Sequence, residues 1–279
     1  MAATPVTSSA SIQLCAHIFG VGIFLVILSS CAAIPERSVS PVPAQTSAQI
    51  IETLQKREAK VLSLKGLFHA EIDGKGMTFA HSLQGSILYQ RPDHYRIKGF
   101  TRFGGLVFDF VMVGEWYALR IQDQPKPIIG GMDNFQQLGN LRLPVFLSLR
   151  AIEVLLGKLP LSSEGVGAVQ VKDGGYQFDI PPDPSTPGSI FTQRILIDQG
   201  SLQVRQLEYV HPHGESVVSI QTSDYRPVGG GGGGKVDPII LPFTVAAEDR
   251  VEAGKITLEF QEMKANETID EGLFTVSGF

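Results

Sequence analysis

The feature that most constrains this chain is a two-residue alternation of apolar and polar side chains that recurs from about residue 63 to about residue 263. In the stretch HSLQGSILYQ, for example, Leu83, Ile87 and Tyr89 alternate with polar residues. Alternation of this period places the apolar side chains on one face of an extended strand. Such stretches are typical of antiparallel strands with one buried and one solvated face. The sequence therefore predicts a mainly β protein.

The strands are predicted to follow one another as a meander. Several lie between residues 63 and 121, and the later ones are predicted at about 168–180, 189–198, 202–211, 215–224, 238–247 and 254–263. Together they number about eleven, and most links between them are short. Residues 122–147 contain Pro and Gly and are predicted to be irregular.

Two segments have a helical period instead. The first spans about residues 46–62, where Thr46 and Gln49 fit a capping box. Its apolar face consists of Ile50, Ile51, Leu54, Val61 and Leu62. The second begins near Ser148 and ends at Gly157 and Pro160. Its apolar stripe consists of Ile152, Leu155 and Leu156.

The N-terminus has the pattern of an export signal. Residues 18–28 are almost entirely apolar, but this run is shorter than the roughly 20 residues of a spanning helix. It ends in Leu28-Ser29-Ser30-Cys31, which resembles the bacterial lipobox. The resemblance implies that residues 1–30 are a signal peptide, removed before Cys31, and that Cys31 carries acyl chains. The alternative is an ordinary signal peptide beside an unrelated cysteine.

The segment after Cys31 is predicted to be a tether. Residues 31–45 are rich in Pro, Ser and Ala, and a single domain is expected over residues 46–279. Two or three acyl chains hold a protein stably on a bilayer. The formal net charge of −5 argues against a nucleic-acid partner, which requires a basic surface.

No pattern of an enzyme or a cofactor site is found. The chain has six histidines, and His211 and His213 form an H-x-H that lacks an evident third metal ligand. Exposed histidines at a strand edge are the simpler interpretation. There is no G-x-S-x-G, HExxH or CxxC, and the acidic residues form no evident acid/base pair. We expect no catalytic residue, no metal and no cofactor.

One apolar strand face is the first candidate site. It consists of Leu83, Ile87, Tyr89, Ile97, Leu106, Phe108, Phe110 and Met112. These residues are predicted to line the inner side of a curved sheet that the two helices cover. The pattern fits either a filled core or a cavity for acyl chains.

A turn with an apolar tip is the second candidate. In KGFTRFGGLVFDF, the glycines Gly104 and Gly105 mark a turn, and Phe103 precedes them beside Arg102. A large apolar side chain is costly to leave in water. Phe103 is therefore expected either to fold back onto the sheet or to project and contact a lipid or membrane.

Several stretches in order resemble the LolB-like outer-membrane lipoproteins of the LolA/LolB superfamily. They are LKGLFHAEI, GSILYQRPDHYRIKGFTRFGGLVFDFVMVGEWYAL and LPVFLSLRAIEVLLGKLP. The resemblance covers about residues 60–160 and rests on the order of features rather than on one motif.

The resemblance implies an unclosed antiparallel β-barrel with a helical lid and an apolar interior. It implies an outer-membrane location facing the periplasm, and a role in receiving acylated lipoproteins or lipids from a periplasmic LolA-like carrier. In LolB a turn-tip leucine is important for the step that inserts lipoproteins into the outer membrane, and the resemblance places Phe103, before Gly104, at the matching position. The alternative is a structural or assembly lipoprotein of the same fold that binds a protein partner in an envelope complex.

Overall fold

The computed structural model describes residues 46–74, 81–122, 124–131, 145–159, 166–182, 190–229, 238–251 and 253–275. All of them belong to the unit Pro43–Phe279. The predicted signal peptide (1–30), Cys31 and the predicted tether (31–45) lie outside the described residues. Their roles stay predictions.

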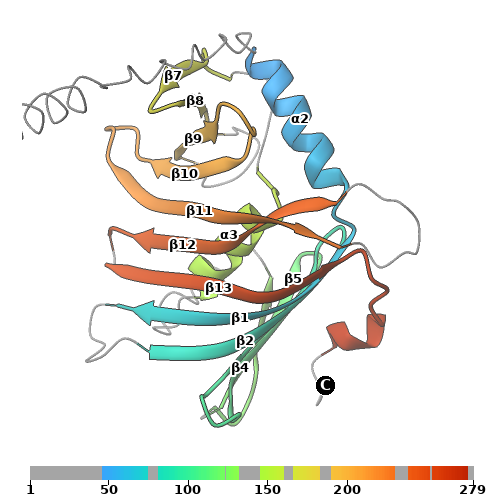
Figure 1. Ribbon diagram of the computed structural model, residues 1–279. Helices are drawn as coiled ribbons and strands as arrows, with labels where there is room; N and C mark the ends of the chain where they lie inside the picture. The colour runs from blue at the N-terminus through green and yellow to red at the C-terminus, as the bar shows by residue number, and fades with distance from the viewer. Residues whose placement is uncertain are drawn as a thin grey trace, which may run out of the picture. The chain divides into compact units, whose positions relative to one another are not determined.

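The described residues form a single antiparallel sheet of thirteen strands (Figure 1). The strands are β1 (Ser63–Asp73), β2 (His81–Gln90), β3 (His94–Phe100), β4 (Leu106–Val113), β5 (Trp116–Ile121), β6 (Ile128–Gly131), β7 (Gln170–Lys172), β8 (Gly175–Ile180), β9 (Thr192–Asp198), β10 (Val204–Val210), β11 (Ser216–Val228), β12 (Ile239–Asp249) and β13 (Gly254–Ala265). Their order is β6-β5-β4-β3-β2-β1-β13-β12-β11-β10-β9-β8-β7. Among the described residues, β6 and β7 each pair with a strand on one side only, so the sheet is not closed. The prediction of an unclosed antiparallel barrel is confirmed.

Two strands were missed in the sequence because their signals are short. Strand β6 lies inside the segment predicted to be irregular. Strands β7 and β8 replace the single strand predicted at 168–180, because Asp173 and Gly174 form a turn between them with φ of 50° and 70°. Two consecutive positive φ angles are typical of the tight hairpin turn that Asp-Gly favours. The count is therefore thirteen strands rather than about eleven.

The meander is interrupted at one place, where the first and last strands are neighbours. Strand β1 pairs with β2 on one side and with β13 on the other. Leu64 lies opposite Ala265 in this pairing. The sheet thus consists of two sequential meanders, β1–β6 and β7–β13, joined along the β1–β13 seam.

Helix α2 (Ser47–Ala59) begins as the sequence predicts. The Thr46 hydroxyl accepts a hydrogen bond from the Gln49 amide at 3.3 Å, and the Thr46 amide donates to Gln49 Oε1 at 3.0 Å. The helix ends at Ala59, however, so the prediction that Leu62 belongs to its apolar face is wrong. Leu62 is 56 % exposed, whereas Val61 is buried. No helix in the described ranges is long and apolar enough to cross a bilayer.

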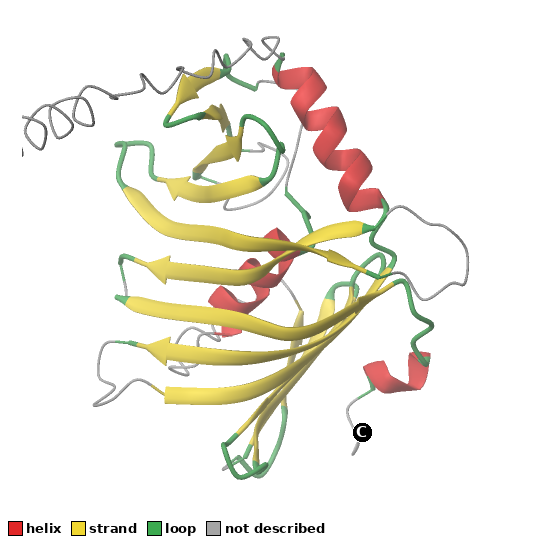
Figure 2. Ribbon diagram, viewed as in Figure 1, coloured by secondary structure: helices red, strands yellow, loops and turns green. Residues whose placement is uncertain are grey.

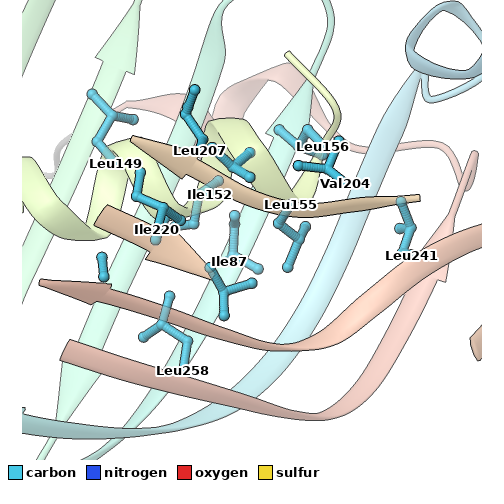
Figure 3. Packing of buried hydrophobic residues seen from close by; sticks show 14 of the residues in the cluster. Ile87, Leu149, Ile152, Leu155, Leu156, Val204, Leu207, Ile220, Leu241 and Leu258 are labelled. Carbon is cyan, nitrogen blue, oxygen red and sulfur yellow. The ribbon is translucent and has the colours of Figure 1, made fainter. Parts of the chain in front are cut away.

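Helix α3 (Val145–Leu155) lies against the concave face of the sheet, which Figure 2 shows behind strands β11–β13. Its residues Leu149, Ile152 and Leu155 are buried in one apolar cluster with strand residues such as Ile87 and Leu258 (Figure 3). This part of the concave face is therefore an apolar core to which both the helix and the strands contribute.

Candidate functional site

A pocket of about 290 Å³ opens where the ends of α2 and α3 meet strands β10–β12. This volume is at the lower end of the range of small-molecule sites, roughly 300–1,000 Å³. Buried apolar side chains form part of its wall, namely Leu54, Val61, Leu155, Leu156, Leu202, Val204, Ile239 and Leu241, and polar groups contribute about as much of its surface as apolar ones. Such a wall suits a ligand that has both an apolar and a polar part.

Charged residues of α2 line the same pocket from its exposed side. Arg57 and Lys60 are exposed, and Glu58 is partly buried. The Arg57 guanidinium donates through Nη1 to the Leu202 carbonyl at 2.7 Å and through Nη2 to the Ser201 carbonyl at 2.9 Å. Arg57 therefore fixes α2 to the turn between β9 and β10.

The β9–β10 turn is held by the carboxylate of Asp198. Its Oδ1 accepts hydrogen bonds from the amides of Gly200 and Ser201, at 3.1 and 2.8 Å, and from the Ser201 hydroxyl at 2.8 Å. The bonds from Ser201 hold the pKa of the Asp198 carboxyl below its usual value, since they favour the charged form. The carbonyls that receive Arg57 thus belong to an ordered turn.

The ends of both helices are also tied to the turn between β2 and β3. Arg91 in this turn pairs with Glu58 of α2 at 2.8 Å. Beyond α3, Lys158 Nζ donates to Asp93 Oδ1 at 2.8 Å and to the Tyr95 hydroxyl at 2.9 Å. Burial raises the pKa of the Tyr95 hydroxyl, so this phenol stays protonated. Two ion pairs therefore connect one turn to both helices beside the pocket.

The predicted apolar strand face lies on the concave side of β2–β4. Its buried members are Ile87, Tyr89, Ile97, Phe108, Phe110 and Met112. Leu83 is partly buried and packs against the same core, and Leu106 is half-buried. None of these eight residues lines the pocket at the helix ends. Their predicted role in holding acyl chains stays a prediction.

The turn between β3 and β4 presents Phe103 to solvent. The Phe103 side chain is 97 % exposed, so it does not fold back onto the sheet. The Thr101 amide donates to the Gly105 carbonyl at 2.7 Å, and the Gly104 amide donates to the Thr101 carbonyl at 2.9 Å. Gly104 has φ of +83°, a conformation that glycine adopts at little cost. A hydrogen-bonded turn therefore holds an aromatic ring at its tip.

A buried ion pair on the outer face of the same hairpin was not predicted. The Arg96 guanidinium donates to the Asp109 carboxylate through Nε at 2.9 Å and through Nη2 at 2.6 Å. Arg96 is 8 % exposed and Asp109 is 5 % exposed. Arg96 Nη1 also donates at 2.6 Å to the Leu273 carbonyl, which lies in the short helix η2 (Glu271–Phe274). The C-terminal segment thus covers this pair.

His211 and His213 lie in the turn between β10 and β11, because β10 ends at Val210. Their rings are 5.0 Å apart between centroids. Across the residues that the structure describes, no group of three or more His, Cys, Asp or Glu side chains could hold a metal ion.

Arg57 and Lys60 were also missed, although the sequence contains a signal for Arg57. Ile50, Leu54, Arg57 and Val61 are spaced by four, three and four residues, so Arg57 occupies a position in the apolar stripe of α2. A charged residue in such a stripe indicates a polar partner or an opening in the core. Here it has both.

No protein-family model and no curated protein matches the chain. Solved structures do resemble it. A LolA superfamily protein from Nitrosomonas europaea has a TM-score of 0.54 at 12% identity, over 85% of this chain and 100% of that one. A putative outer membrane lipoprotein-sorting protein domain from Vibrio parahaemolyticus has a TM-score of 0.51 at 11% identity, over 80% and 95%. A DUF1329 family protein from Desulfovibrio piger has a TM-score of 0.57 at 10% identity, over 82% and 95%.

At these identities the likeness concerns the fold, and it agrees with the resemblance seen in the sequence. The chain therefore has a fold similar to that of the LolA superfamily structure and of the lipoprotein-sorting domain.

Proposed function

We propose that this protein is an envelope lipoprotein that binds acyl chains and helps to place lipids or lipoproteins in the outer membrane. In this proposal Cys31 carries the lipid anchor, residues 31–45 form the tether, and the domain over residues 46–279 faces the periplasm. A periplasmic LolA-like carrier delivers the acylated cargo. The protein acts as a binding protein rather than as an enzyme.

The observation that carries the proposal is the exposure of Phe103. A fully exposed phenylalanine loses the favourable transfer of its ring out of water, about 1.5–3 kcal/mol. The ordered turn keeps the ring from folding back, and this cost is recovered when the ring enters a bilayer. The pocket at the helix ends supports the proposal as well, because leucine and valine side chains form part of its wall.

Transfer in this proposal is passive. An acyl chain moves from the carrier to the pocket and then to the membrane, with affinity increasing at each step. No cofactor or energy source is then required, because each step is downhill. The contacts of Arg57, Arg91 and Lys158 at the helix ends must loosen as the chain passes.

Phe103→Ala is expected to slow delivery of a fluorescent acyl lipid from the protein to vesicles by about 10- to 100-fold, from the lost transfer energy of the ring. Phe103→Leu should retain most of the rate, because leucine keeps an apolar tip. Thermal unfolding of both variants should match the wild type, since the ring makes no buried contact.

Trp116→Ala is the matched control for this experiment. Trp116 is another exposed aromatic residue, 67 % exposed, and it lies opposite Val113 at the other end of β4. Its removal should leave the delivery rate unchanged. The proposal is wrong if Phe103→Ala delivers lipid as fast as the wild type.

A partner-binding lipoprotein is the second candidate function, and a patch on the outer face favours it. Val113, Trp116 and Ile129 are exposed and lie on one face of β4–β6. Among the described residues, strand β6 pairs with β5 alone, and an edge of this kind offers backbone groups to another chain. This function predicts no saturable binding of an acyl probe. It also predicts that Trp116→Ser disrupts a defined protein complex, as measured by size-exclusion chromatography of the purified complex.

A further inference from the structure

We propose that the pocket at the helix ends selects a single acyl chain with an anionic head, either a carboxylate or a phosphate, and that Arg57 and Lys60 bind this head. The inference rests on the proposed acyl-chain binding and adds the class of ligand. It excludes a neutral glycolipid and a cationic lipid as the preferred cargo of this pocket.

In the described part of the chain, the charged side chains around the pocket leave positive charge that no acidic side chain neutralises. Within the described ranges, Arg57 and Lys60 form no ion pair with an acidic side chain, and Arg57 bonds only to the neutral carbonyls of Ser201 and Leu202. The acidic residue of the pocket, Glu58, is already neutralised by Arg91 at 2.8 Å. The positive charges of Arg57 and Lys60 are thus left for a ligand.

The guanidinium is also well placed to bind an anion. Two carbonyl acceptors hold it at the pocket and use two of the five N–H donors that a guanidinium carries. A guanidinium with free donors matches the geometry of a carboxylate or phosphate. Lys60 lies one turn further along the chain of α2 and supplies a flexible second charge.

The apolar part of the wall indicates that the anionic group is the head of a lipid. Leu159 and Ile240 are partly or fully exposed apolar residues of the wall, so a free inorganic anion would leave this apolar surface uncovered. The volume of about 290 Å³ suits one chain better than the several chains of a complete lipoprotein anchor. A single-chain anionic lipid satisfies both the wall and the charges.

The experiment compares ligands that share one chain and differ in the head. The chain from Ala32 to Phe279, which lacks the predicted signal peptide and Cys31 and so carries no attached acyl chain to compete, is titrated by calorimetry with dodecyl phosphate, monolauroylglycerol and dodecyltrimethylammonium below their micelle concentrations. Dodecyl phosphate is expected to bind about tenfold or more tightly than the neutral ligand, as one charge-assisted hydrogen bond implies. Inorganic phosphate alone should not bind.

Substitutions at the C-terminal end of α2 test which residues cause the preference for an anionic head. Lys60→Gln should reduce the preference for dodecyl phosphate and leave the affinity for monolauroylglycerol unchanged. Arg57→Gln should reduce the same preference. Lys56→Gln is the matched control, because Lys56 lies on the same helix but pairs with Glu52 at 2.6 Å and does not line the pocket. It should change neither affinity.

The outcomes separate the two proposals. If none of the three lipids binds, the proposed acyl-chain function fails and this inference fails with it. If all three bind equally, or if inorganic phosphate binds as tightly, the inference is wrong and acyl-chain binding stands. Arg57→Gln removes hydrogen bonds that hold α2 and can weaken the fold, so Lys60→Gln decides. An unchanged head preference in Lys60→Gln overturns the inference.

Discussion

Asp109→Ala is expected to destabilise the protein by about 3–5 kcal/mol, the usual cost of leaving one partner of a buried ion pair without its counter-charge. The variant removes both acceptors of the bidentate contact with Arg96, and that guanidinium stays under the C-terminal segment. The free energy of unfolding in urea, followed by circular dichroism, measures the loss. Because β3 and β4 carry the Phe103 turn, delivery of lipid should fall as well.

A double variant shows whether the unpaired charge or the lost packing causes the destabilisation. Arg96→Met with Asp109→Leu removes both charges and keeps the volume, so it should be more stable than Asp109→Ala alone. Glu52→Ala breaks an exposed pair with Lys56 and should leave the unfolding midpoint in place. If Asp109→Ala is as stable as Glu52→Ala, the pair does not hold this hairpin.

Phe108→Ala is expected to cost about 3–5 kcal/mol on the opposite face of the same hairpin, because it leaves a cavity in the core. Phe108 lies directly opposite Gly99, and its ring covers the glycine. A Cβ built at Gly99 would be 2.3 Å from Phe108 Cε1, so the ring occupies the space of the missing side chain. The free energy of unfolding in urea measures this effect too.

Gly99→Val tests the same contact from the other strand. Alone it should destabilise the protein by about 1–3 kcal/mol through overpacking. Combined with Phe108→Ala, the valine fills part of the cavity, and the loss should be smaller than the sum of the two single losses. Strictly additive losses would mean that the ring and the glycine do not share this space.

Most strands could be predicted from the sequence because their buried apolar residues recur at every second position. The alternation through Ile87, Tyr89 and Ile97 predicts strands with a buried face, and all three residues are buried there. The capping box of Thr46 is equally local and is present. Strand β6 was missed because four residues are too few to show a period, and β7 and β8 were predicted as one strand because the turn at Asp173 and Gly174 was not recognised.

The candidate site was only partly predictable, because it depends on contacts between distant segments. The exposure of Phe103 was one of two expected outcomes, and only the turn geometry decides between them. Arg57 meets the carbonyls of Ser201 and Leu202 across most of the domain, and no spacing in α2 indicates these partners. The covering of Arg96 and Asp109 by the C-terminal segment is likewise a tertiary contact.

The seam between β1 and β13 has a consequence for the order in which the chain folds. Each meander can form from neighbouring segments as they are made, but β1 has no partner on its second edge until β13 exists. An unpaired edge can pair with other chains and promote aggregation. The seam pairs strands from the two ends of the domain, which are far apart in the sequence. Contacts of this kind form slowly. The newly made chain therefore has to be kept from aggregating until its last strand is available.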